Sequence, residues 1–275
     1  MNITAADVNN LRKQTGAGMM DCKKALVEAN GNIQEAIDYL RKQGQKVAAK
    51  RSDRDAAEGL ILAKSTADGT RGAMIVLNCE TDFVAKNEDF GNVANDILNL
   101  AIEAKAESLD ALLAMKYPGS DLKISDKITE EIGKIGEKIE LSAYASLAAG
   151  KVVAYNHPGN RLASIVGFNK STSEDIGKDV AMQVAAMDPV SLKADDVPQD
   201  VIARELEIGK ELAIQEGKPA EMAEKIAQGR LGKFFKENTL LNQAFIKDNK
   251  VSVEQYLKST DGELTVVDFK RCALS

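Results

Sequence analysis

The side chains of this sequence that are best suited to chemistry or recognition lie in the segment Asn78–Asn87, which reads NCETDFVAKN. The segment joins an apolar run typical of a β-strand, residues 73–77, to an amphipathic pattern that begins near Glu88. A loop held between two rigid elements often carries function, because the scaffold fixes its position. This loop places an acidic residue, Asp82, beside an aromatic one, Phe83, so it is the first candidate for a functional site.

The rest of the sequence offers little for catalysis. His157 is the only histidine, which excludes the H-E-x-x-H motif and a multi-histidine metal site. Cys22, Cys79 and Cys272 lie far apart without C-x-x-C spacing, and we expect reduced, buried thiols. The Gly-Lys pair within residues 229–234 lacks the spacing of a phosphate-binding loop. We therefore expect no enzyme activity, no metal and no cofactor.

The composition is that of a soluble globular protein, with 275 residues of which 28% are charged and 44% hydrophobic. A chain of this length is expected to form two or more domains. The net charge of −6 and the sequence pI near 5.1 disfavour nucleic acid as a direct partner, because phosphate binding needs a basic surface. No apolar run approaches the roughly 18 residues of a membrane span, and residues 1–4 lack the start of a secretory signal. We expect a cytoplasmic protein without membrane contact.

Three short helices are predicted at the start of the chain from their apolar periodicity. Thr4 provides an N-cap for the first helix, the second covers about residues 20–29, and the third is expected to end at Gly44. A basic run, residues 41–54, overlaps this end. We interpret it as a solvated linker, with a nucleic-acid patch as the alternative. Residues 1–54 are thus expected to form a helical domain and its basic linker.

From residue 55 the hydrophobic pattern changes to that of β-strands. Residues 59–64 and 71–77 are predicted strands around a turn at Asp68-Gly69. A helix with one apolar face follows, and it is expected to lie on the sheet. Its apolar residues are Phe90, Val93, Ala94, Ile97, Leu98, Ala101 and Ile102. Residues 55–138 are therefore expected to form one half of an α+β core.

The same order of elements returns later in the chain. Strands are predicted at 150–155 and 161–168, and a helix follows over about 176–185. We interpret this as an internal duplication of a sheet-plus-helix unit. The second copy has Ser-Thr-Ser at 171–173 in place of Thr-Asp-Phe at 81–83. What the copies share is expected to be scaffold, so the activity is expected in the first copy.

The second half of the core is expected to cover residues 139–190 and 236–275, beginning with a strand near 139–147 and ending with strands that finish its sheet. A helical hairpin, residues 191–235, is expected to be inserted in it. The two helices of the hairpin are expected to face each other through their larger apolar side chains, namely Ile202, Leu206 and Leu212 against Met222, Ile226 and Leu231.

Three groups of motifs occur in order along nearly the whole chain: LRKQTGAGMMDCKKAL at 11–26, NCETDFV at 78–84, and GKP at 217–219 with AEK and GR shortly after it. These motifs resemble those of the bacterial translation elongation factor Ts family. The resemblance implies an α+β fold with a ubiquitin-associated-like three-helix domain at the N-terminus. It further implies a core of two related halves with antiparallel sheets and a helical hairpin inserted in the second half.

The resemblance also implies a function, which is guanine nucleotide exchange on elongation factor Tu in its GDP-bound and nucleotide-free forms. In this family the Thr-Asp-Phe-Val segment disturbs the magnesium site of the partner. That role falls here on Thr81, Asp82, Phe83 and Val84, and further partner contacts fall on Met19, Met20 and His157. A homodimer through the hairpin is a further expectation, as in some relatives. The terminal helical module of some members is not expected, and neither are its contacts.

Each implied contact has a structural alternative. Phe83 can instead cover the end of its own sheet, and Asp82 can cap the loop. Met19 and Met20 cannot both face inward on a short helix, so one of them is expected to be exposed and adaptable. His157 can be a plain turn residue in Asn-His-Pro-Gly. The alternative for the whole protein is a ubiquitin-associated-type interaction scaffold without exchange activity.

Overall fold

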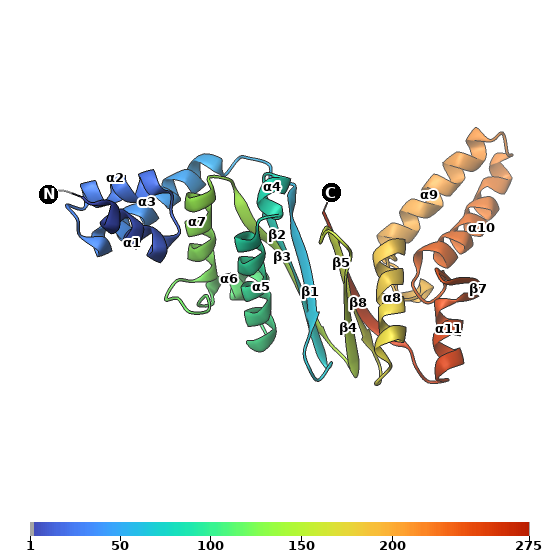
Figure 1. The fold of residues 1–275 in the computed structure, drawn as a ribbon. Helices are drawn as coiled ribbons and strands as arrows, with labels where there is room; N and C mark the ends of the chain where they lie inside the picture. Colours follow the sequence, from blue (N-terminus) through green and yellow to red (C-terminus); the bar gives the residue numbers. More distant parts are fainter. Residues whose placement is uncertain (1–2, 275) are drawn as a thin grey trace. The chain divides into compact units, whose positions relative to one another are not determined.

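Three helices come first in the computed structural model, which describes residues 3–274. They are α1 Ala5–Thr15, α2 Met19–Glu28 and α3 Ile33–Arg51 (Figure 1). α1 begins with a capping box, in which Asp7 N donates to Thr4 Oγ1 at 3.2 Å and Thr4 N donates to the Asp7 carboxylate at 2.9 Å. The helices enclose a small apolar core of Val8, Leu11, Ala17, Cys22, Ala25, Leu26, Ala29 and Ala36.

α3 is longer than the sequence predicts. The prediction that it ends at Gly44 and gives way to a linker is wrong, because the helix continues to Arg51. A glycine inside a helix costs about 1 kcal/mol relative to alanine, but Gly44 is buried where α3 packs on another helix. Lys50 and Arg51 lie in the last turn, where cations interact favourably with the helix dipole. The basic run is thus largely the end of a helix.

The first sheet contains β1 Glu58–Ser65, β2 Arg71–Cys79 and β3 Ile139–Ala148, in the order β1-β2-β3. Between β2 and β3 lie α4 Asp82–Ala85, α5 Glu88–Glu103, α6 Leu109–Ala114 and α7 Ile124–Ile135. All seven apolar residues predicted for the inner face of α5 are buried. The predicted strand, turn and helix pattern of this region is confirmed.

β3 corrects one of the predicted boundaries. The expectation that the second half begins at residue 139 is wrong, since β3 completes the first sheet and residues 139–145 belong to the first of two compact units. The alternation of buried and exposed residues at the start of β3 fits a strand on any sheet with one covered face. The neighbours of a strand in a sheet are set by contacts between residues far apart in the chain. The local pattern of apolar residues does not identify these neighbours.

The second sheet contains β4 Lys151–Asn156, β5 Leu162–Phe168 and β8 Val266–Ala273, in the order β4-β5-β8. β4 and β5 are antiparallel, with Lys151 opposite Phe168. α8 Glu174–Met187 follows β5 and packs on both strands. The expectation that the tail returns to finish this sheet is confirmed by β8. Before β8 come β6 Ala244–Phe245, β7 Asp248–Ser252 and α11 Val253–Thr260.

The predicted helical hairpin consists of α9 Gln199–Gln215 and α10 Ala220–Asn238, preceded by a 3-10 turn at Ala194–Asp196. The residues buried between its two helices are small ones. The buried residues are Gly209, Ala213, Ala223 and Ala227, whereas Leu212 and Met222 are exposed. A Cβ on Gly209 would lie 3.1 Å from the Cα of Ala227, so the backbones approach closely. The predicted facing residues are therefore wrong for Leu212 and Met222.

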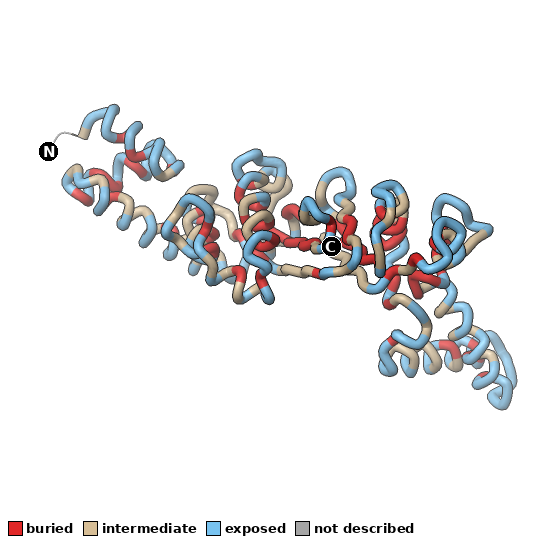
Figure 2. Tube along the Cα trace, turned by 90° about the horizontal axis from the view of Figure 1, so that it is seen from below, coloured by how far each residue is buried: buried red, intermediate tan, exposed pale blue. Residues whose placement is uncertain are grey.

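The chain divides into two compact units. The first holds the three N-terminal helices and residues 74–145, and the second holds residues 63–73 and 146–272. In each unit the buried residues follow the sheet and the inner helix faces (Figure 2). Both sheets have a pair of strands followed by a helix, and the duplication proposed for them stays a prediction. Within residues 3–274, no helix has the length and apolar character needed to cross a membrane.

Candidate functional site

The predicted functional segment Thr81–Val84 forms one helical turn, α4, between β2 and α5. Thr81 is its N-cap, and the Thr81 hydroxyl accepts a hydrogen bond from Val84 N at 3.4 Å. Asn87 caps α5 in the same way, by accepting from Asp89 N at 2.8 Å. Caps of this kind satisfy backbone donors that have no partner inside a helix. The loop predicted from the sequence is thus ordered, because Thr81 caps α4 within it and Asn87 caps α5 at its end.

Glu137, two residues before the start of β3, clamps the base of this turn at the end of β2. Its carboxylate accepts from Thr81 Oγ1 at 2.7 Å and from Thr81 N at 3.1 Å. Glu137 follows Gly136, which ends α7 in the left-handed conformation with φ 81°. That conformation favours glycine, and it turns the chain from α7 toward β3. The α7–β3 connection therefore supplies the acceptor that holds Thr81.

Glu80, the residue before Thr81, is held by two further groups. A single guanidinium nitrogen of Arg51 donates to both Glu80 carboxylate oxygens, at 2.8 and 2.9 Å. Lys138 N donates to Glu80 Oε1 at 2.6 Å. The hydrogen bond from the Lys138 backbone has the largest effect on the pKa of Glu80, and together with the Arg51 contact it outweighs burial, so the pKa is lowered. Glu80 therefore stays ionised at neutral pH and links α3, β2 and β3.

Cys79 anchors the same strand end from the inside. Its side chain is fully buried, and its Sγ donates to the Thr81 carbonyl at 3.1 Å. Burial and the nearby Glu137 carboxylate raise the pKa of Cys79 from 9.0 to about 11. All three cysteines are free thiols, as predicted. Burial is confirmed for Cys22 and Cys79, and Cys272 is half-buried.

The raised pKa of Cys79 predicts a loss of stability in alkali. The folded state favours the protonated thiol, so its contribution to stability is complete below the unfolded pKa of 9.0 and is lost as the pH rises toward about 11. Between about pH 8 and pH 11, the free energy of unfolding is expected to fall more steeply for the wild type than for Cys79→Ala. Urea unfolding followed by circular dichroism measures both, and parallel curves would contradict the assignment.

Phe83 is the residue of the turn that projects into solvent. Its side chain is 82% exposed, so the alternative that it covers its own sheet is wrong. Thr81, Asp82 and Val84 are half-buried. The Asp82 carboxylate accepts from Lys86 Nζ at 2.6 Å, and this contact lowers its pKa. The pair is exposed and contributes little to stability, so the Asp82 carboxylate remains accessible to another donor.

Met19 and Met20, at the start of α2, are 56% and 72% exposed. The sequence predicts one exposed methionine, and the structure has two. The inward face of α2 is occupied by Cys22, Ala25 and Leu26, which leaves both methionines on the outer surface of the bundle. Exposed methionines adapt their shape to a partner at low cost. They belong to the same compact unit as Thr81–Val84.

His157 belongs to the second unit, in the turn between β4 and β5. It is exposed, and its Nδ1 lies 2.9 Å from the hydroxyl of Tyr155. The preceding Asn156 binds both backbone groups of Ala63, with its Oδ1 accepting from Ala63 N at 2.7 Å and its Nδ2 donating to Ala63 O at 2.9 Å. The turn that presents His157 is therefore tied down at its base.

The clamp residues Arg51, Glu80, Glu137 and Lys138 were not found by the sequence analysis. The contacts join residues 29 to 58 positions apart in the chain, and no spacing rule connects them. One weak signal exists, since Glu80 lies inside the NCETDFV motif, next to the residues that were singled out. Within residues 3–274, no cluster of three or more His, Cys, Asp or Glu side chains is arranged to hold a metal ion.

Comparisons with known proteins agree on one family. The family model described as "Elongation factor TS" matches residues 80–275. The elongation factor Ts of Christiangramia forsetii is 53% identical over 274 residues, covering 99% of this chain and 98% of that protein. The elongation factor Ts of Amoebophilus asiaticus is 53% identical, covering 98% of this chain and 98% of that protein. The elongation factor Ts of Porphyromonas gingivalis is 48% identical, covering 100% of this chain and 99% of that protein. With a matching family model over more than half of its length and relatives that match it nearly end to end, this chain belongs to the elongation factor Ts family.

Proposed function

We propose that this protein is a guanine nucleotide exchange factor for elongation factor Tu, which acts in the cytoplasm during the elongation phase of protein synthesis. Membership in the elongation factor Ts family supports the type of activity. The observation that carries the mechanism is the 82% exposure of Phe83 on a turn whose base is clamped by Glu80 and Glu137. An exposed aromatic side chain on a fixed support is suited to enter a partner protein.

The exchange reaction follows from differential binding. A GTPase holds GDP through a phosphate-binding loop and a Mg²⁺ ion. A factor that speeds GDP release binds the nucleotide-free partner more tightly than the GDP-bound one, and by linkage GDP weakens the binding of the factor to the same degree. Burial of Phe83 between helices of the partner supplies about 1.5–3 kcal/mol. This free energy displaces groups that hold the Mg²⁺ ion and the phosphates.

The other residues of the segment have distinct roles in this mechanism. Thr81 holds the turn in place through Glu137, so little ordering entropy is lost when the partner binds. Asp82 accepts a hydrogen bond from a donor of the partner, and the half-buried Val84 adds an apolar contact beside Phe83. Met19 and Met20 add a second apolar contact from the N-terminal bundle, and His157 adds a contact from the second unit. No bond of the nucleotide is made or broken, so the protein is not an enzyme in the hydrolytic or transfer sense.

The proposal is tested by following fluorescently labelled GDP as it leaves elongation factor Tu, with excess unlabelled GDP as the chase. Addition of this protein is expected to accelerate release, with an effect that saturates with its concentration. Raising the concentration of free GDP is expected to weaken the complex, as linkage requires. Binding without any acceleration of release would favour the interaction-scaffold alternative.

A further inference from the structure

α3 extends without interruption from the N-terminal bundle to the segment Thr81–Val84, which we call the exchange segment. Its first half packs in the bundle core through Ala36, with Ile33, Ile37 and Leu40 against that core. Its last residue, Arg51, binds Glu80 immediately before the segment Thr81–Val84. One helix therefore packs on α2, which carries Met19 and Met20, and also contacts Glu80, which precedes the turn that carries Phe83.

The middle of α3 is fixed where it crosses α7. A Cβ on Gly133 of α7 would lie 2.8 Å from the Cα of Gly44, and a Cβ on Gly44 would lie 3.2 Å from the Thr129 carbonyl oxygen. The two backbones are thus in direct contact at a pair of glycines. Packing this close leaves no room for one helix to roll on the other. The crossing sets the direction in which the end of α3 points.

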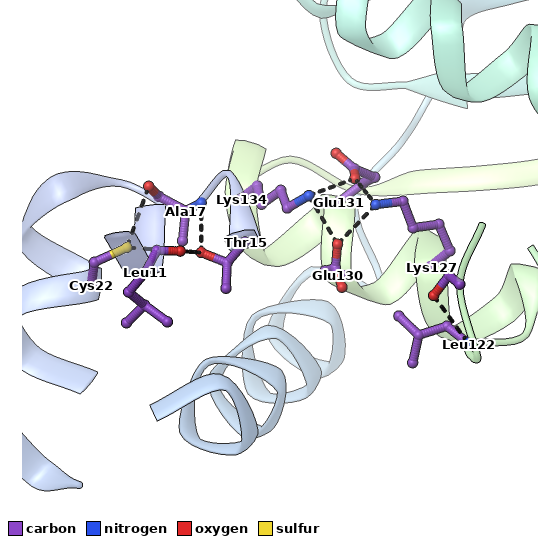
Figure 3. A network of polar contacts seen from close by, with 10 residues as sticks. Leu11, Thr15, Ala17, Cys22, Leu122, Lys127, Glu130, Glu131 and Lys134 are labelled. Carbon is purple, nitrogen blue, oxygen red and sulfur yellow. Dashed lines mark hydrogen bonds and ion pairs between the residues drawn. The ribbon is translucent and has the colours of Figure 1, made fainter. Parts of the chain in front are cut away.

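An ion-pair cluster lies along α7 near this crossing (Figure 3). Lys127 and Lys134 each pair with both Glu130 and Glu131, at 2.8 to 3.0 Å. Burial would raise the pKa of Glu130, but hydrogen bonds from Lys127 and Lys134 outweigh this effect and lower it. The cluster orders Lys134, whose side chain lies against Gly16 at the end of α1. The bundle and α7 are therefore in contact at two places, Gly16 and Gly44.

We propose that Arg51 is a positioning residue for nucleotide exchange, which transmits the fixed direction of α3 to Phe83 through Glu80. This inference rests on the proposed function. Arg51 and Glu80 are largely shielded, with 35% and 17% of their side chains exposed, and Glu80 is held from its other side by Lys138 N at 2.6 Å. Without Arg51, α3 keeps its crossing with α7 but loses its direct contact with the residue that precedes the segment. With Arg51, the bundle contact and Phe83 meet the partner as one body.

The test uses the full chain and labelled GDP bound to elongation factor Tu. The release rate at saturating factor and the half-saturating concentration are measured for the wild type, Arg51→Gln, Arg51→Lys, Glu80→Gln and the double variant. Glutamine at position 80 keeps an acceptor for Lys138 N and removes the charge that binds Arg51. Arg51→Gln is expected to lower the saturated rate by about threefold to tenfold, with less than about a twofold change in the half-saturating concentration.

Two comparisons separate positioning from a merely structural role. A single nitrogen of Arg51 makes both contacts to Glu80, so Arg51→Lys, which keeps one charged donor, is expected to retain most of the rate. In the Glu80→Gln background, Arg51→Gln is expected to have no further effect, because the two residues act through one contact. Lys258→Gln is the matched control. It removes a cation from an exposed pair with Glu254 in the other unit, and its rate is expected to equal that of the wild type.

Three results would overturn the inference. The first is an unchanged saturated rate in Arg51→Gln, and the second is a fall in this rate that is as large in the Glu80→Gln background as in the wild type. The third is a change of the half-saturating concentration with no change of the saturated rate. The last result would assign Arg51 to direct contact with the partner. Thermal unfolding by circular dichroism checks that each variant folds. If the wild type itself fails to accelerate GDP release, the proposed function fails, and this outcome is distinct from failure of the Arg51 inference.

Discussion

Replacing Phe83 with alanine is expected to slow the exchange reaction by about tenfold to hundredfold while the protein stays folded. The expected loss follows from the 1.5–3 kcal/mol that burial of an aromatic side chain in the partner supplies, at roughly 1.4 kcal/mol for each factor of ten. The fold is expected to persist, because a side chain that is 82% exposed contributes little to the core. The rate of labelled GDP release from elongation factor Tu at a fixed factor concentration measures the loss.

The matched control for this substitution is Ile214→Ala on α9. Ile214 is also a large exposed apolar side chain, with 55% of its surface accessible, and it lies on the hairpin, which holds none of the residues assigned to exchange. We expect Ile214→Ala to keep the wild-type rate. Urea unfolding should give the same midpoint for both variants as for the wild type. A Phe83→Ala protein with an unchanged rate would remove the wedge from the mechanism.

The second large effect is expected from Gly133→Leu at the crossing of α3 and α7. A side chain at this position meets the Gly44 backbone, with the first atom already 2.8 Å from Gly44 Cα. Forcing a side chain into a packed contact costs about 1–3 kcal/mol. We therefore expect a lower urea midpoint. The saturated exchange rate is also expected to fall, because α3 can no longer hold its direction toward Glu80.

Gly232→Leu on α10 is the control for this prediction. A Cβ on Gly232 meets nothing within 4 Å, and leucine is a better helix former than glycine by somewhat less than about 1 kcal/mol. Gly232→Leu is thus expected to stabilise the protein slightly and to leave exchange unchanged. A Gly133→Leu variant as stable and as active as Gly232→Leu would show that the crossing has no role in either property.

Local sequence signals were sufficient for most elements of the fold. The Thr4 capping box, the glycine that ends α1 and the Asn32 cap of α3 lie within a few residues of the groups they satisfy. The apolar stripe of α5 and the turn between β4 and β5 are likewise local. The family motifs gave the segment Thr81–Val84 in the same way, because its residue types are contiguous in the chain.

Packing overruled local signals in other elements. Gly44 is typical of a helix end, but here it lies where α3 contacts α7. The helix therefore continues to Arg51. β3 joined the first sheet, although its own pattern fits either sheet. In the hairpin, the small residues Gly209 and Ala227 lie between the helices, because they allow a closer approach than larger apolar side chains do. In each case the deciding partner lies far away in the sequence.

By itself, the sequence indicated most of the helices and strands, the family and the candidate segment Thr81–Val84, because each of these signals lies in residues a few positions apart. Only the tertiary structure decided that Phe83 and both methionines are exposed, and that Arg51, Glu137 and Lys138 hold the segment in place. Exposure and long-range hydrogen bonds arise when distant parts of the chain pack together. A linear pattern records which side chains prefer water or the core, but not which surface each one meets.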